Sequence, residues 1–305
     1  MNFLKPKSLI SYIYEPKTLR TMETTRQISQ TEHQFFKLRT LIRGIIALAV
    51  FGLLTGNFAN AVATSGFKED GNGKKVILEV KKAIPEAMDN RDAQKLVTLK
   101  YRLNQVEKEN LKPYVNYYKA YINYRLSTVQ ADISEDQKTK YLDEGIKFLE
   151  QAVEQKKNFA EAYAMMGNFY GMKIDGALSG MRYGPKSGEL YEKAQQYDPQ
   201  NPRIHMLLGI GKYYTPSMFG GGAEKAMAYF QDALKYFDTY KSANELMPDW
   251  GHAEIYAWIG QVHARQDQYE AAVASYKKAL KVHPDYGWVK NVLLPQTQKK
   301  LNSSG

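Results

Sequence analysis

A spaced pattern of large and small residues near the C-terminus constrains the fold of this chain more than any other feature. The pattern has two halves and a closing proline: Tyr256-x2-Ile259-Gly260-x2-His263, then Ala272-x3-Tyr276-x2-Ala279, then Pro284. Large residues three or four positions apart share one face of a helix, and a small residue among them lets a second helix approach closely. The pattern therefore predicts two helices packed against each other as a hairpin.

The same two halves recur upstream in the same order. The first half returns as Tyr163-x2-Met166-Gly167-x2-Tyr170 and as His205-x2-Leu208-Gly209-x2-Lys212, where Lys212 replaces the last aromatic residue. The second half returns as Gly145-x3-Leu149-x2-Ala152, Ser187-x3-Tyr191-x2-Ala194 and Ala226-x3-Phe230-x2-Ala233. This spacing resembles that of the tetratricopeptide repeat (TPR), a helix-turn-helix unit of about 34 residues.

The resemblance implies an all-α fold, an α-solenoid of stacked helix-turn-helix hairpins that serves as a binding scaffold. We expect an array of about four repeats at residues 111–284. Two apolar stripes before it predict a helical pair at 75–110, and the Gly-rich, polar stretch before that pair predicts a linker at 64–74. Apolar residues between Tyr286 and Leu293 predict a capping helix and tail at 285–305, which would cover the last repeat.

Residues 1–63 have the composition of an N-terminal leader. Basic residues precede an apolar run at 44–54, and Ala59, Ala61 and Ala63 supply the small residues that a signal peptidase requires. We interpret this region as a signal peptide cleaved after Ala61 or Ala63, which would make the protein a bacterial export to the periplasm or the medium. The alternative is an uncleaved signal anchor at 44–63, and the chain could start at Met1 or Met22.

Charge and cysteine content exclude several classes of function. The net charge is +10, but residues 1–63 hold eight Lys or Arg and three Asp or Glu, so the remainder carries only +5. This excess is too small and too scattered for nucleic-acid binding, and contact with a membrane is expected only through an uncleaved leader. The chain has no Cys, which excludes disulfides, thiolate metal sites and a lipidated N-terminal cysteine.

Three insertions depart from the repeat. The turn of the Gly167 repeat is longer by eight residues, that of the Gly209 repeat by five, and a further twelve residues lie between Ala233 and Gly260. The first two insertions combine Gly with large apolar residues and should lie on the same edge of a solenoid. They could form one apolar site from Met181, Tyr183, Tyr213, Met218 and Phe219, although Met181 and Phe219 could instead plug gaps beneath the loops. Gly220-Gly221-Gly222 lacks the Lys and Ser or Thr of a phosphate-binding loop.

The concave groove is the second candidate surface. TPR domains that clamp a carboxylate use Lys, Asn and Arg on the groove side of the first helix. The corresponding positions of this chain include Asn168, Arg203, Met206 and Gln261, of which only Asn168 and Arg203 could serve in such a clamp. The groove thus suits a mixed apolar and polar partner. A row formed by Tyr114, Tyr117, Tyr121 and Tyr124 could also face the groove. We favour a helix register shifted by one residue, in which Tyr117, Ala120, Tyr121 and Tyr124 form the buried face. The polar residues Asn116, Lys119 and Asn123 then point to water.

Catalysis has little support in the sequence. The five His residues have no recognisable partners, and no nucleophile elbow or His-Glu-x-x-His motif is present. We therefore expect a non-enzyme without a cofactor or metal, acting as a scaffold or adaptor of the cell envelope that binds a protein or peptide. The alternative is a periplasmic binder of a small apolar ligand, because the stretch from Pro216 to Gly222 resembles TPR components associated with bacterial transporters.

Overall fold

The computed structural model describes residues 72–129 and 133–304. The predicted leader at 1–63 and most of the predicted linker lie outside the described residues, so the signal peptide, the anchor and the location stay predictions. In the described part every regular element is helical. None of the described helices combines the length and the hydropathy needed to cross a bilayer.

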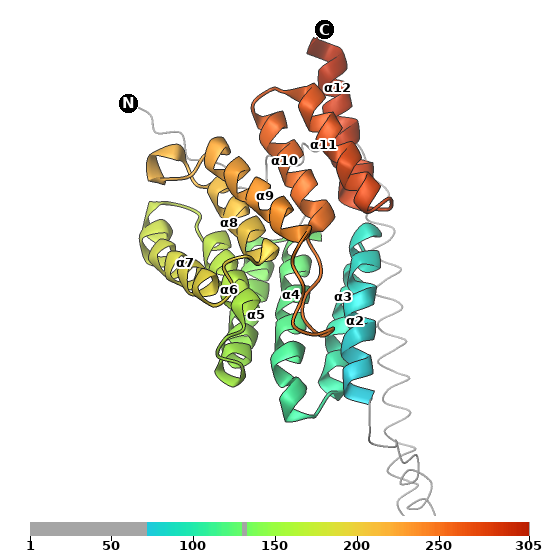
Figure 1. The fold of residues 1–305 in the computed structure, drawn as a ribbon, viewed down its shortest axis with the longest axis vertical. Helices are drawn as coiled ribbons and strands as arrows, with labels where there is room; N and C mark the ends of the chain where they lie inside the picture. The colour runs from blue at the N-terminus through green and yellow to red at the C-terminus, as the bar shows by residue number, and fades with distance from the viewer. Residues whose placement is uncertain (1–71, 130–132, 305) are drawn as a thin grey trace, which may run out of the picture. The chain divides into compact units, whose positions relative to one another are not determined.

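The described helices form hairpins of neighbours in the chain (Figure 1). Two helices come first, α2 (Asn72–Asp89) and α3 (Ala93–Arg102), followed by the 3-10 turns η2 (Leu103–Gln105) and η3 (Glu109–Leu111). Four pairs make up the array: α4 (Lys112–Val129) with α5 (Glu135–Gln155), α6 (Ala160–Met172) with α7 (Ala177–Tyr197), α8 (Pro202–Tyr214) with α9 (Ala223–Phe237), and α10 (His252–Arg265) with α11 (Tyr269–Val282). The π-helical turn η5 (Val289–Leu293) and α12 (Leu294–Ser304) end the described chain. The predicted all-α array of stacked hairpins is confirmed.

The three insertions take three different forms. Most of the first belongs to α7, which begins at Ala177. The second contains the 3-10 turn η4 (Ser217–Phe219), and Gly220 and Gly222 follow it with φ of 81° and 105°, a backbone region that favours glycine. The third is an irregular segment between α9 and α10.

The C-terminal region covers the last hairpin, as predicted. Val289 and Leu293 are buried against the core of α10 and α11. The segment before η5 also reaches the first described helix, where His283 Nε2 lies 2.7 Å from Asp89 Oδ2 and the Gly287 amide donates to Asp89 Oδ1 at 3.2 Å. The first and last parts of the described chain are therefore in direct contact.

Close approach within the hairpins depends on the glycines of the repeat pattern. A Cβ added at Gly209 in α8 would lie 2.5 Å from Cε1 of Phe230 in α9, and Phe230 is fully buried. Gly260 stands in the same relation to Tyr276. These contacts are the small-against-large packing that the sequence pattern predicts.

Substitution Gly209→Ala is expected to lower the free energy of unfolding by about 1–3 kcal/mol, because the new methyl group overpacks a site that Phe230 already fills. Urea denaturation of the purified protein measures the change. Gly211→Ala is the matched control, since it lies in the same helix and its added Cβ would have no atom within 4 Å. There the higher helix propensity of Ala should raise stability by up to about 1 kcal/mol. Equal effects of both substitutions would contradict the packing argument.

Candidate functional site

The tyrosine row of α4 is buried, and so are the polar residues beside it. Tyr117 is fully buried and Tyr121 and Tyr124 nearly so, as expected, and Tyr114 is nearly buried as well. The expectation that Asn116 and Asn123 point to water is wrong. Asn123 accepts a hydrogen bond from Lys100 Nζ at 2.9 Å and donates to the Tyr141 carbonyl at 3.2 Å and to Glu144 Oε2 at 2.9 Å. These partners come from α3 and α5, and their hydrogen bonds offset the cost of burying the amide.

The tyrosines face the irregular segment between α9 and α10, here called the groove segment (residues 238–251). Tyr118 Oη donates to the Leu246 carbonyl at 3.1 Å, and Asn244 Nδ2 donates to Tyr114 Oη at 3.0 Å. Trp250 Nε1 donates to Tyr117 Oη at 3.1 Å. Figure 1 shows this segment as an orange loop that crosses in front of α4. The chain itself thus occupies the α4 surface that a peptide in the groove would contact.

Lys81 of α2 holds the groove segment from the other side. Its Nζ donates to the Glu245 carbonyl at 2.9 Å and to the Met247 carbonyl at 2.8 Å, and lies 2.9 Å from Asp249 Oδ2. One ammonium group therefore satisfies two backbone carbonyls and a carboxylate. The twelve extra residues seen in the sequence build this segment, but their spacing gave no sign of where it would pack.

Arg203, a predicted groove residue, forms a buried ion pair. Its Nη2 lies 3.2 Å from Oε1 of Glu161 in α6, and both side chains are 2% exposed. Asn201 Nδ2 donates to the same carboxylate oxygen at 2.8 Å. The guanidinium lies over the ring of Tyr240 in the groove segment, 5.2 Å from its centroid. Nε of Arg203 and Oε2 of Glu161 are buried without a hydrogen-bond partner among the described residues. The charge of Arg203 is nevertheless paired inside the protein, so it is not presented to a partner.

A second ion pair joins α4 to α10. Arg125 contacts Glu254, and its Nη2 also donates to Tyr121 Oη at 2.7 Å. The guanidinium lies 5.2 Å from the centroid of the Trp250 ring. Burial raises the pKa of the adjacent Tyr124 to about 12, although Arg125 lowers it, so this phenol is neutral at physiological pH. These groups act as packing and hydrogen-bonding elements rather than as acids or bases.

The other predicted groove residues are also engaged in internal contacts. Met206 is fully buried and lies under Gly251 of the groove segment. Asn168 Nδ2 lies 3.5 Å from Met172 Sδ, and Gln261 Nε2 donates to Tyr276 Oη at 3.1 Å. No group of three or more His, Asp or Glu in the described residues could hold a metal ion.

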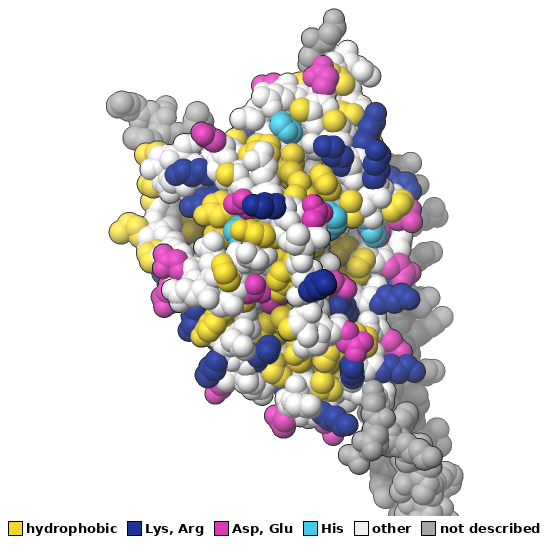
Figure 2. Space-filling view, in the orientation of Figure 1, with side chains coloured by type: hydrophobic (Ala, Val, Ile, Leu, Met, Phe, Trp, Pro, Cys, Tyr) yellow, Lys and Arg dark blue, Asp and Glu magenta, His cyan; other side chains and the backbone are white. Residues whose placement is uncertain are grey.

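The predicted loop residues lie mostly in solvent. Met181, Met218 and Phe219 are 71–84% exposed, and so is Leu178, which the sequence analysis missed. We call these four side chains the loop edge; Figure 2 shows hydrophobic side chains standing out over the start of α7 and the loop between α8 and α9. The expectation that Met181 and Phe219 plug gaps beneath the loops is wrong. Tyr183 and Tyr213 are half-buried, with ring centroids 5.9 Å from Tyr170 and 5.6 Å from Trp258.

Comparison with solved structures confirms the TPR resemblance at the level of the fold. The thermophilic TPR protein TTC0263 of Thermus thermophilus matches with a TM-score of 0.53 and 15% identity, covering 75% of this chain and 99% of that one. The HusA haemophore of Porphyromonas gingivalis matches with a TM-score of 0.51 and 19% identity, covering 64% of this chain and 96% of that one.

Comparison with sequences gives a family but no individual relative. No curated protein matches the chain. Residues 80–292, well over half of the chain, match the family model described as regulator of microtubule dynamics protein 1-3. The chain therefore belongs to the family of regulator of microtubule dynamics proteins 1-3.

Proposed function

We propose that the protein is a non-enzymatic helical-repeat scaffold that binds a protein partner through the loop edge. The observation that carries this proposal is the exposure of Leu178, Met181, Met218 and Phe219, four large apolar side chains on the turns of two consecutive hairpins. Removing such apolar surface from water against a partner favours association. Large apolar side chains that are exposed at successive turns of the array are candidates for an interaction site.

A polypeptide fits the loop edge better than an enclosed small ligand. Pockets for small molecules bury most of the ligand surface, whereas Met218 and Phe219 project into solvent. The likeness to the HusA haemophore concerns the fold at 19% identity and adds no ligand to this chain. The groove segment covers the concave face of α4, which leaves the loop edge as the candidate surface.

The identity of the partner and its compartment belong to the same proposal. The predicted leader favours a partner in the cell envelope. The family description concerns microtubule dynamics, so tubulin is a second candidate partner, and both can be tested with the same variants.

Photocrosslinking tests the loop edge directly. A crosslinking amino acid at Phe219 is expected to capture one or a few proteins in the native host, while the same amino acid at Tyr101 should not. Tyr101 is the matched control because it is 72% exposed, against 71% for Phe219, and lies on α3. Binding to tubulin is tested separately, by co-sedimentation of the protein with purified tubulin.

Substitution Met218→Asp is expected to reduce the crosslink yield at Phe219 by at least about tenfold, because a central apolar contact commonly contributes about 2 kcal/mol to binding. The free energy of unfolding should change by less than about 0.5 kcal/mol, since the side chain is exposed. Capture of the same proteins from Tyr101 and Phe219, or an unchanged yield in Met218→Asp, would refute a protein-binding role of the loop edge.

A further inference from the structure

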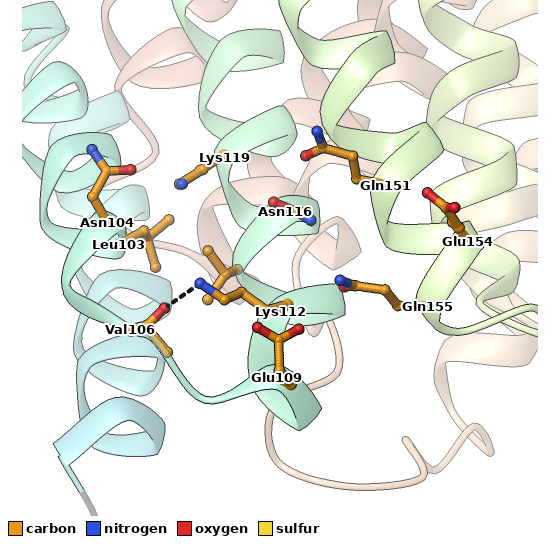
Figure 3. A pocket seen from close by; sticks show the side chains of 11 residues that line it. Leu103, Asn104, Val106, Glu109, Lys112, Asn116, Lys119, Gln151, Glu154 and Gln155 are labelled. Carbon is orange, nitrogen blue, oxygen red and sulfur yellow. Dashed lines mark hydrogen bonds between the residues drawn. The ribbon is translucent and has the colours of Figure 1, made fainter. Parts of the chain in front are cut away.

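An open depression of 480 Å³ lies between the η2 and η3 turns, α4 and α5, away from the residues of the loop edge. Figure 3 shows its lining side chains, which come from all four elements. Its apolar walls are the buried side chains of Leu103, Val106 and Val115. The polar side chains that matter here are Glu109, Lys112, Asn116, Lys119 and Glu154.

Asn116 is the first sign that the depression holds a ligand. The residue is 8% exposed, its amide has no hydrogen-bond partner among the described residues, and its amide atoms are open to the depression and not sealed in the core. Asn123, two turns further along α4, has three such partners. The Asn116 amide is thus held at the wall of the depression with its donor and acceptor unused by the rest of the described chain. In Figure 3 the Asn116 amide lies in the middle of the lining side chains, where a bound molecule in the depression can hydrogen-bond to it in place of water.

Lys119 is the second sign that the depression holds a ligand. Its side chain is half-buried, and within the described part of the chain its ammonium contacts only the Phe148 ring, at 5.4 Å from the centroid. The neighbouring lysines are already engaged, since Lys100 pairs with Glu144 and Lys112 donates to the Val106 carbonyl. Burial lowers the pKa of Lys119, the nearby Lys112 and Lys100 lower it further, and the carboxylate of Glu144 opposes these effects only in part. An anion beside Lys119 would further stabilise its charged form.

Two carboxylates on the rim of the depression limit the class of anion that can bind there. Glu109 and Glu154 line the same depression, and neither forms an ion pair with another described residue. Two lysines and two glutamates make the lining neutral overall. A dianion such as phosphate would be repelled by the rim, whereas a molecule that carries one carboxylate and one ammonium group matches both signs of charge.

We propose that this depression binds a small zwitterion of the amino-acid class, with its carboxylate against Lys119 and Asn116 and its ammonium group facing the rim carboxylates Glu109 and Glu154. The apolar walls formed by Leu103, Val106 and Val115 would contact the side chain of the ligand. This site is separate from the loop edge, so either can exist without the other.

Binding is tested on the full-length protein by saturation-transfer NMR and calorimetry with the free L-amino acids, their carboxamide derivatives and inorganic phosphate. At least one amino acid should bind, and its carboxamide derivative, which lacks the carboxylate, should bind at least about tenfold more weakly. Lys119→Met should weaken binding by about tenfold or more, and Asn116→Leu and Glu154→Gln should also weaken it.

Lys186→Met is the matched control, because Lys186 also lies over an aromatic ring, 5.5 Å from the centroid of Tyr170, but in α7. It should leave amino-acid binding unchanged. Thermal melting identifies variants that fail to fold. Glu154→Gln changes an exposed side chain and should leave the fold intact, so it tests the proposal even where Lys119→Met or Asn116→Leu fails to fold. Absence of amino-acid binding, equal binding of the carboxamide, tighter binding of phosphate, or an effect of Lys186→Met equal to that of Lys119→Met would each overturn the proposal.

Discussion

Substitution Arg203→Met is expected to lower the free energy of unfolding by about 3–5 kcal/mol, which is a large part of the stability of a typical domain. The variant keeps most of the apolar volume of the side chain but leaves the Glu161 carboxylate buried without its counter-ion. Glu161 retains the hydrogen bond from Asn201, which cannot replace a full positive charge. Guanidinium denaturation followed by circular dichroism measures the change.

A surface pair in the same protein provides the control. Arg102 pairs with Glu79, with side chains 44% and 38% exposed, so Arg102→Met should cost at most about 1 kcal/mol. The double variant Glu161→Gln with Arg203→Met should recover most of the stability lost in Arg203→Met, because neither buried charge remains. If Arg203→Met lowers the free energy of unfolding no more than Arg102→Met does, burial of the Arg203–Glu161 ion pair does not determine its contribution to stability.

The hairpins could be predicted because their information is local. Gly209 and Phe230, or Gly260 and Tyr276, lie within one repeat at fixed spacing, and each pair meets in the structure as the pattern requires. Helical periodicity and one small residue per hairpin are enough to define such a contact. Repetition along the chain then extends the prediction to the whole array.

The sequence could not predict that the groove segment covers α4, because this arrangement depends on contacts between residues far apart in the sequence. Lys81 meets Asp249, and Tyr118 meets Leu246, with no periodic signal that links the two members of either pair. The burial of Asn116 and Asn123 in α4 could not be predicted for the same reason. Asn123 looked too polar for burial until Lys100 and Glu144 were placed beside it by neighbouring helices.

The loop residues were singled out correctly as unusual, but composition alone could not determine their exposure. Gly beside Met and Phe is compatible with a loop that packs inward and with one that projects outward. Because α7 absorbs most of its insertion, Leu178 and Met181 occupy the first turns of a helix, and both side chains are exposed there. Whether the first turns of a helix are exposed depends on the tertiary structure, because it is determined by where the adjacent hairpin ends.

Substitution Trp250→Ala is expected to lower the free energy of unfolding by about 3 kcal/mol, near the lower limit for loss of a large aromatic side chain because Trp250 is half-buried. Its ring stacks on Tyr121 with centroids 4.7 Å apart, and its Nε1 donates to Tyr117 Oη. Without the ring, the groove segment loses its main aromatic contact with α4. Hydrogen exchange in residues 238–251 should therefore become faster, while exchange in α11 should change much less.

Trp250→Phe separates packing from hydrogen bonding in this contact. It keeps an aromatic ring over Tyr121 but removes the indole N–H, so it should cost only about 1 kcal/mol, with little change in exchange of the groove segment. Equal effects of the two variants would assign the contact to the hydrogen bond instead of the ring. Faster exchange confined to the groove segment in Trp250→Ala, with the crosslink yield at Phe219 unchanged, would show that the groove segment is an internal structural element and that partner binding depends on the loop edge.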